Sequence, residues 1–149
     1  MRILAIDVGR RRVGFAISDP TRTLARPLTT IVLSSRDSQG GVDRVIREVE
    51  RVDAELAADA DRIEAIIVGM PLRLDGSPSE QTTIVAEFVA RLRTRTEIPV
   101  TTEDERLTSR EAESRLAVTE RDWRRRKGHL DAAAAAVFLQ DYLDRGRSA

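Results

Sequence analysis

The stretch that decides the fold is ILAIDVGRRRVGFAISD, residues 3–19. Residues 3–8 are apolar apart from Asp7, which is typical of a buried central strand that stops at a carboxylate and a turn. Residues 13–18 then alternate larger and smaller side chains with the period of two that a strand requires. A parallel connection needs a crossover of about a dozen residues, so these two strands must be antiparallel.

Outward from this segment, residues 24–33 predict a third strand, also antiparallel because its connection is short. Residues 41–58 carry apolar side chains at the spacing of an amphipathic helix, and residues 64–70 form an apolar strand of the parallel type. A capping box with Ser77 as the N-cap, proline next and glutamate at the third helical position predicts a helix to about residue 95, with Ile84 on its core face.

The last elements expected are a strand over residues 99–102, a helix from a second capping box at Thr108 to about residue 118, and a helix over residues 130–143. This order predicts an α/β fold, a mixed sheet with helices on its faces and with the first and fourth strands near its centre. The length of 149 residues suits one domain spanning residues 1–149.

Composition excludes several classes of site and location. The chain has no cysteine and a single histidine, His129, which excludes disulfides, thiolate nucleophiles and zinc centres with two imidazoles. The longest apolar run, residues 132–139, is far shorter than the ~20 residues that span a bilayer, and the start of the chain lacks the pattern of a signal peptide. We therefore expect a cytoplasmic protein without membrane contact.

Acidic residues stand at the ends of the expected elements: Asp7 in the first strand, Asp104 and Glu105 after the last strand, and Asp131 at the start of the final helix. The carboxyl ends of strands in an open α/β sheet form the crevice where ligands bind, so these acids could meet there. Carboxylates without nitrogen or sulfur ligands favour Mg²⁺ or Mn²⁺, and two such ions ~4 Å apart suit phosphodiester hydrolysis. The alternative is that each acid separately caps a turn or helix.

Four segments carry a family resemblance: ILAIDVGRRRVGFAISD (3–19), IIVGMPLRLDGSPSEQT (66–82), EDERLTSREAESRL (103–116) and KGHLDAAAAAVFLQDYL (127–143). In their order and spacing the chain resembles the YqgF family of pre-16S rRNA nucleases, also called RuvX or Holliday junction resolvase-like proteins. The resemblance implies a ribonuclease H-like fold with a five-stranded sheet in the order 3-2-1-4-5. It also implies metal-dependent cleavage of RNA in the maturation of the 5′ end of the 16S precursor.

The same resemblance implies the site residues. Asp7 takes the role of the first-strand aspartate, Asp104 and Glu105 those of the acids in a DER motif, and Asp131 that of the final-helix aspartate. We expect Asp7, Glu105 and Asp131 to hold the two metal ions. Glu105 is preferred to Asp104 because adjacent side chains point in different directions, but the sequence leaves this choice open.

Two groups of basic residues are candidates for phosphate contacts. Arg10, Arg11 and Arg12 follow Asp7 directly, where guanidinium groups could hold a phosphate at the site. We expect Arg106, the arginine of the DER motif, to bind the substrate as well. The second group is a basic loop at residues 121–127 with five basic side chains and one acidic one; its candidate contacts are Trp123, Arg124, Arg125, Arg126 and Lys127. In this loop Trp123 could stack on an unpaired base.

Both basic groups could equally be solvated surface charge, with Trp123 anchored in the core, and His129 is more simply a half-exposed loop residue than a proton or phosphate contact. Two rival functions also stay open. One is a DNA resolvase, which would act as a dimer on a four-way junction, and the other is a non-catalytic nucleic-acid-binding module. The expected partner is the 16S rRNA precursor, with branched or single-stranded DNA as the alternative, bound by a monomer or homodimer.

Overall fold

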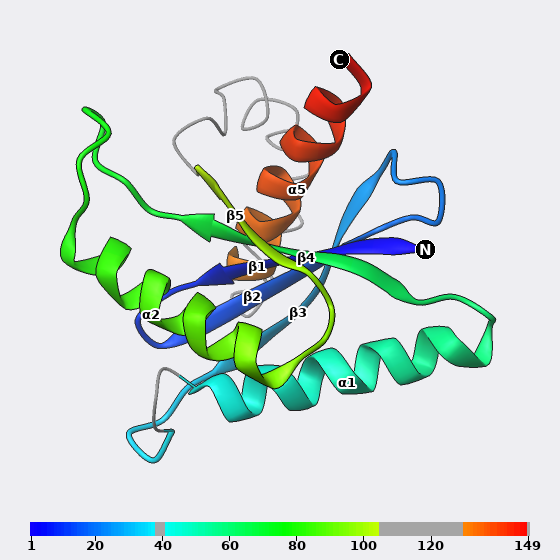
Figure 1. Ribbon diagram of the computed structural model, residues 1–149, viewed down its shortest axis with the longest axis horizontal. Helices are drawn as coiled ribbons and strands as arrows, with labels where there is room; N and C mark the ends of the chain where they lie inside the picture. The colour runs from blue at the N-terminus through cyan, green and yellow to red at the C-terminus, as the bar shows by residue number, and fades with distance from the viewer. Residues whose placement is uncertain (38–40, 105–129, 149) are drawn as a thin grey trace.

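A computed structural model describes residues 1–37, 41–104 and 130–148 of the chain (Figure 1). The elements are β1 (Arg2–Val8), β2 (Arg12–Ser18), β3 (Ala25–Val32), α1 (Val42–Ala58), β4 (Ile63–Met70), α2 (Glu80–Arg95), β5 (Val100–Asp104) and α5 (Leu130–Ser148). They form one five-stranded sheet in the order β3-β2-β1-β4-β5. The first three strands are antiparallel, whereas β4 runs parallel to β1 and β5 parallel to β4, which confirms the predicted order and the central place of β1.

The two faces of β1 belong to two separate cores. Leu4, Ile6 and Val8 belong to the core that α1 and α2 share with the sheet, while Ile3 and Ala5 belong to the core beneath α5. Figure 1 shows α1 and α2 on one side of the sheet and α5 on the other. Because side chains alternate along a strand, Asp7 falls on the face that α5 covers.

Local chemistry explains where α1 begins. Gly41 is its N-cap and has φ of +76°, a backbone conformation that favours glycine. A Cβ atom at this position would also collide with the side chain of Leu33. The buried face of the helix is Val42, Val45, Ile46, Val49 and Val52, as the apolar spacing predicts.

The predicted start of α2 is wrong by two residues. The helix is capped by Ser79, which exchanges hydrogen bonds with Thr82 in a capping box. Ser77 instead donates its backbone N–H and its hydroxyl to the carboxylate of Asp75, and Pro78 after it pairs with Leu72 in an isolated antiparallel bridge rather than starting the helix. Ile84, predicted to be in the core, is 47% exposed.

The other differences between the predicted and the observed elements concern the lengths of β5 and α5. β5 continues two residues beyond its predicted end, and α5 extends to Ser148. The predicted helix at residues 108–118 and the basic loop lie outside the described residues. In the part of the chain that is described, no helix is long and apolar enough to cross a membrane.

Candidate functional site

Asp7 lies where the connections of the sheet change direction. The chain leaves β1 toward β2 on one side, whereas it leaves β4 through α2 toward β5 on the other side. The carboxyl ends of β1 and β4 therefore mark the place where α/β sheets commonly bind their ligands. Asp7 is half-buried one residue before the end of β1, as the sequence predicts for a site residue.

The arginine turn, residues 10–12, is held close to Asp7 by its backbone. The N–H of Gly9 donates to the carbonyl of Arg12 at 2.8 Å, and the N–H of Leu33 donates to the carbonyl of Arg11 at 2.6 Å. A Cβ atom on Gly9 would stand 2.8 Å from the Arg12 oxygen, so this tight closure requires glycine. Arg10, Arg11 and Arg12 are exposed at the same edge of the sheet as Asp7.

The end of β5 carries two acids on opposite faces of the sheet. Val100 belongs to the core under α1 and α2, so the alternation of β5 places Asp104 on that side and Glu103 on the α5 side with Asp7. Asp104 is paired with Met70, which also packs against the α1 and α2 core. Sequence-based reasoning did not select Glu103, because it ended the strand at residue 102. Glu105 lies outside the described residues.

Glu103 stands level with the end of β1. It pairs with Gly69 of β4, and Val68 of β4 pairs with Ile6, the residue before Asp7. Since Gly69 has no side chain, the sheet surface between Asp7 and Glu103 carries no side chain from β4. Glu103 comes three residues after Val100, and this odd spacing puts the two side chains on opposite faces of the strand. That spacing was the signal in the sequence that could have identified Glu103.

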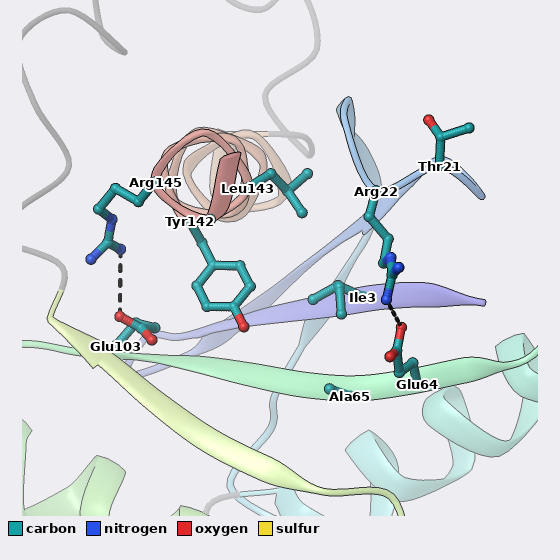
Figure 2. Close-up of a pocket in the computed structure, with 10 residues that line it drawn as sticks. Ile3, Thr21, Arg22, Glu64, Ala65, Glu103, Tyr142, Leu143 and Arg145 are labelled. Carbon is teal, nitrogen blue, oxygen red and sulfur yellow. Dashed lines mark hydrogen bonds and ion pairs between the residues drawn. The ribbon is translucent and has the colours of Figure 1, made fainter. Parts of the chain in front are cut away.

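A cavity of about 640 Å³ opens on the α5 side of the sheet beside Glu103 (Figure 2). Glu103 accepts from Arg145 of α5 at 3.4 Å at one end, and Arg22 donates to Glu64 at 2.6 Å at the other end. Ile3 lies on the sheet between these two ion pairs (Figure 2). Among the described residues that line the cavity, two arginines pair with two glutamates, so this lining lacks the excess of positive charge that a phosphate site needs.

The direction of α5 brings the backbone of Asp131 toward the same edge. The side chain of Gln140 accepts from the N–H of Ala25 and donates to the carbonyl of Thr23, both at 2.9 Å, at the end of the sheet where β1 begins. From there back to residue 131 the helix spans ~14 Å. The distance along β1 from Ile3 to Asp7 is a similar ~13 Å. The start of α5 therefore reaches toward the edge of the sheet that carries Asp7.

Gln81 in the first turn of α2 is a further candidate residue beside Asp7, one that sequence-based reasoning missed. Its amide nitrogen donates to the backbone carbonyl of Val8 at 3.1 Å, directly after Asp7. Its buried Oε1 has no hydrogen-bond partner within the described parts of the chain. No local pattern marks this contact, because the two residues are 73 positions apart.

The ligand atoms available at this edge are of the chemical type that a magnesium or manganese site requires. Asp7 and Glu103 supply carboxylate oxygens on one face, and hard divalent cations prefer such oxygens. Within residues 1–37, 41–104 and 130–148 no three acidic or histidine side chains form a metal-binding group. Only the backbone of Asp131 is described. The remaining candidates lie outside the described residues: Glu105, Arg106, Trp123, Arg124, Arg125, Arg126, Lys127 and His129.

The chain matches a protein family over nearly its whole length. Residues 1–145 match the model of the family described as "RuvX: Holliday junction resolvase". A protein of Roseiflexus sp. (strain RS-1) named "Putative pre-16S rRNA nuclease" is 38% identical over 146 residues, covering 98% of this chain and 96% of its own length. A protein of the same name from Anaeromyxobacter sp. (strain K) is 39% identical over 149 residues, covering 97% of this chain and 98% of its own.

The fold is also found in solved structures. T. thermophilus RuvC in complex with a Holliday junction substrate superimposes with a TM-score of 0.59 and 18% identity, over 98% of this chain and 96% of that chain. A second structure of Thermus thermophilus RuvC gives a TM-score of 0.57 and 19% identity, over 98% and 97% of the two chains. This likeness confirms the ribonuclease H-like fold.

Proposed function

The chain belongs to the RuvX family, and on that premise we propose that it is a divalent-metal-dependent nuclease that cleaves RNA at the 5′ end of the 16S rRNA precursor. The membership supports a hydrolase acting on phosphodiester bonds. The observation that carries the proposal is the position of Asp7 at the junction between β1 and β4, on the face covered by α5. The arginine turn beside it supplies positive charge for a polyanionic substrate.

In this proposal Asp7, Glu105 and Asp131 hold the metal ions, with Glu103 as an additional carboxylate on the same face as Asp7. Bound Mg²⁺ or Mn²⁺, expected as two ions, would supply activation of water and stabilisation of the leaving oxygen. The arginines of the turn hold the phosphates that flank the scissile bond. Gln81 fixes the carbonyl of Val8 and thereby the backbone that carries Asp7.

The alternation of β5 argues against Asp104 as a metal ligand. Asp104 falls on the α1 and α2 side of the sheet, whereas Asp7 falls on the α5 side. An aspartate on the far face cannot share an ion with Asp7 unless the end of the strand twists. Asp104 is therefore better suited to positioning the end of β5 than to catalysis.

RNA is preferred as the substrate because the full-length relatives carry the name of a pre-16S rRNA nuclease. The second candidate is a Holliday junction resolvase acting on DNA, which the family description favours. Ribonuclease H-like sites can do the same chemistry on either polymer, and the 2′-hydroxyl is the local difference between them.

Three matched substrates test this proposal: a 16S precursor 5′ end, a linear single-stranded RNA of the same sequence, and a four-way DNA junction. Each is incubated with the protein and Mg²⁺, Mn²⁺ or chelator, beside an Asp7→Asn variant. We expect metal-dependent cleavage of the precursor RNA that chelator and Asp7→Asn both abolish. Symmetric cleavage of the junction alone would instead identify a resolvase, and binding without cleavage would identify a non-catalytic module.

A further inference from the structure

The loop between β4 and α2, residues 71–79, holds an apolar side chain in water at its tip. Leu74 is 96% exposed. It lies in a tight turn in which the N–H of Gly76 donates to the carbonyl of Arg73 at 2.8 Å, with Gly76 at φ +89°. The turn is thus a defined structure that carries a nearly fully exposed leucine.

Further contacts fix this turn from both sides. The N–H of Arg73 donates to the carbonyl of Ser77 at 3.0 Å, and the carboxylate of Asp75 accepts from the N–H of Ser77 at 2.9 Å and from its hydroxyl at 2.6 Å. At its base Leu72 pairs with Pro78 in an isolated antiparallel bridge. The backbone is therefore ordered before any ligand binds, and little entropy would be lost when the tip contacts one.

An ordered tip that presents leucine to water forgoes the stabilisation that burying this side chain would give. Isolated exposed apolar residues are common and need no explanation by themselves. Leu74 differs from them in its location. The loop leaves the sheet at the end of β4, and Figure 1 shows it projecting beyond the edge toward which β1 and β4 point.

The loop is also tied to the proposed cleavage site. Its far end leads into α2, where Gln81 contacts the carbonyl of Val8, next to Asp7. From Met70 to Leu74 the chain can reach at most ~14 Å. A nucleic acid strand that has a phosphate at Asp7 and runs toward this loop would reach Leu74 within several nucleotides, since stacked nucleotides rise ~3.4 Å each.

We propose that Leu74 is a wedge that inserts between neighbouring bases of the substrate where a duplex meets a single strand, with the exposed Arg73 against the adjacent phosphate. Leucine is among the apolar side chains that unstack base steps in this way. The wedge selects substrates by their structure at the boundary rather than by their sequence. This inference rests on the proposed nuclease function.

The experiment uses the full-length protein and an RNA hairpin with a single-stranded 5′ extension, carrying 2-aminopurine at one position at a time across the boundary. The variant is Leu74→Ser. Leu24→Ser is its control, because Leu24 is 66% exposed in the turn between β2 and β3. Leu74→Met keeps an apolar side chain of similar length.

We expect wild type, Leu24→Ser and Leu74→Met to raise the fluorescence at one boundary position, because the base there loses its stacking. Leu74→Ser should lose this rise and bind the hairpin about 5- to 100-fold more weakly, with unchanged affinity for a fully single-stranded RNA and an unchanged melting temperature. A fluorescence rise and affinity equal to wild type in Leu74→Ser would overturn the wedge while leaving the nuclease in place. A wild-type protein that binds and cleaves no nucleic acid would overturn both.

Discussion

The side chain of Gln81 and the backbone of Val8 are joined by a 3.1 Å hydrogen bond that ties the first turn of α2 to the end of β1. The bond uses the amide nitrogen of Gln81, and the carbonyl oxygen of the same side chain is buried without a partner in the described structure. An unpaired buried acceptor carries a desolvation penalty, so this side chain adds little net stability. Its effect is to fix the position of the residue that follows Asp7.

Replacing Gln81 with methionine should therefore reduce cleavage more than stability. The variant leaves the Val8 carbonyl without this donor but also removes the unpaired Oε1, so the two effects oppose each other and the free energy of unfolding should change by less than ~1 kcal/mol. The turnover number should fall about 10- to 100-fold, because a small displacement of Asp7 misplaces the site. Thermal unfolding and single-turnover cleavage measure the two effects.

Gln140→Met is the matched control for this variant. Gln140 makes hydrogen bonds with Ala25, Thr23 and Asp144 at the other end of the sheet, so its loss should lower the melting temperature and leave turnover unchanged. Equal turnover in Gln81→Met and wild type would show that Gln81 only supports the fold.

Asp131→Asn tests the metal ligands. Asparagine keeps the shape and one acceptor, so a purely capping aspartate would lose only a fraction of ~1 kcal/mol. A ligand should instead lose metal affinity and at least ~100-fold in cleavage, and the melting temperature of the metal-free protein should stay equal or rise as repulsion among the acids falls. Calorimetric titration with Mn²⁺ beside a cleavage assay separates the two, and normal metal binding and turnover would remove Asp131 from the site.

Removing the charge of the basic loop by the triple change of Arg124, Arg125 and Arg126 to alanine should weaken RNA binding and reduce its dependence on salt. Arginines that neutralise phosphates release counterions, and each contact adds ~0.7–0.9 to the slope of log affinity against log salt. Binding measured from low to physiological salt gives this slope. An affinity and slope equal to wild type would make the loop a solvated surface segment.

Gly9→Ala should destabilise the protein by about 1–3 kcal/mol, because the new Cβ atom would meet the backbone oxygen of Arg12 at 2.8 Å. Gly146→Ala is its control, since Gly146 lies in α5 and a Cβ atom there would meet nothing within 4 Å. That change should stabilise by up to ~1 kcal/mol, as alanine is the better helix former. Urea unfolding of both variants checks the pair, and a Gly9→Ala protein as stable as wild type would show that the arginine turn can relax.

Asp61 should make stability depend on pH in the acid range. Hydrogen bonds from Arg2 and from the N-terminal ammonium group lower the pKa of Asp61 from its ordinary 3.8 to about 2. A carboxyl whose pKa is lower in the folded state stabilises the fold above pH 3.8, and this contribution disappears as the pH falls through about 2. Asp61→Asn should therefore be less stable than wild type at pH 7, and the two should converge toward pH 2 in urea unfolding measured at each pH.

The sequence by itself determined the local elements and the antiparallel direction of the first three strands, whereas the full order of the sheet was implied by the family resemblance. The apolar run before Asp7, the short turns that force β1, β2 and β3 to be antiparallel, and the amphipathic spacing of α1 are patterns within a few neighbouring residues. Local periodicity decides them, because strand and helix expose their apolar faces at fixed intervals. The position of Asp7 at the end of a central strand followed directly from these patterns.

Only the tertiary structure decided which side chains meet. Glu103 shares a face with Asp7 because the register of β5 on β4 sets its parity, and a shift of one residue would exchange it with Asp104. Ser79 rather than Ser77 caps α2, and Gln81 reaches Val8 across 73 residues of chain. The contact between Gln81 and Val8 depends on packing between distant segments, so no local pattern in the sequence records it.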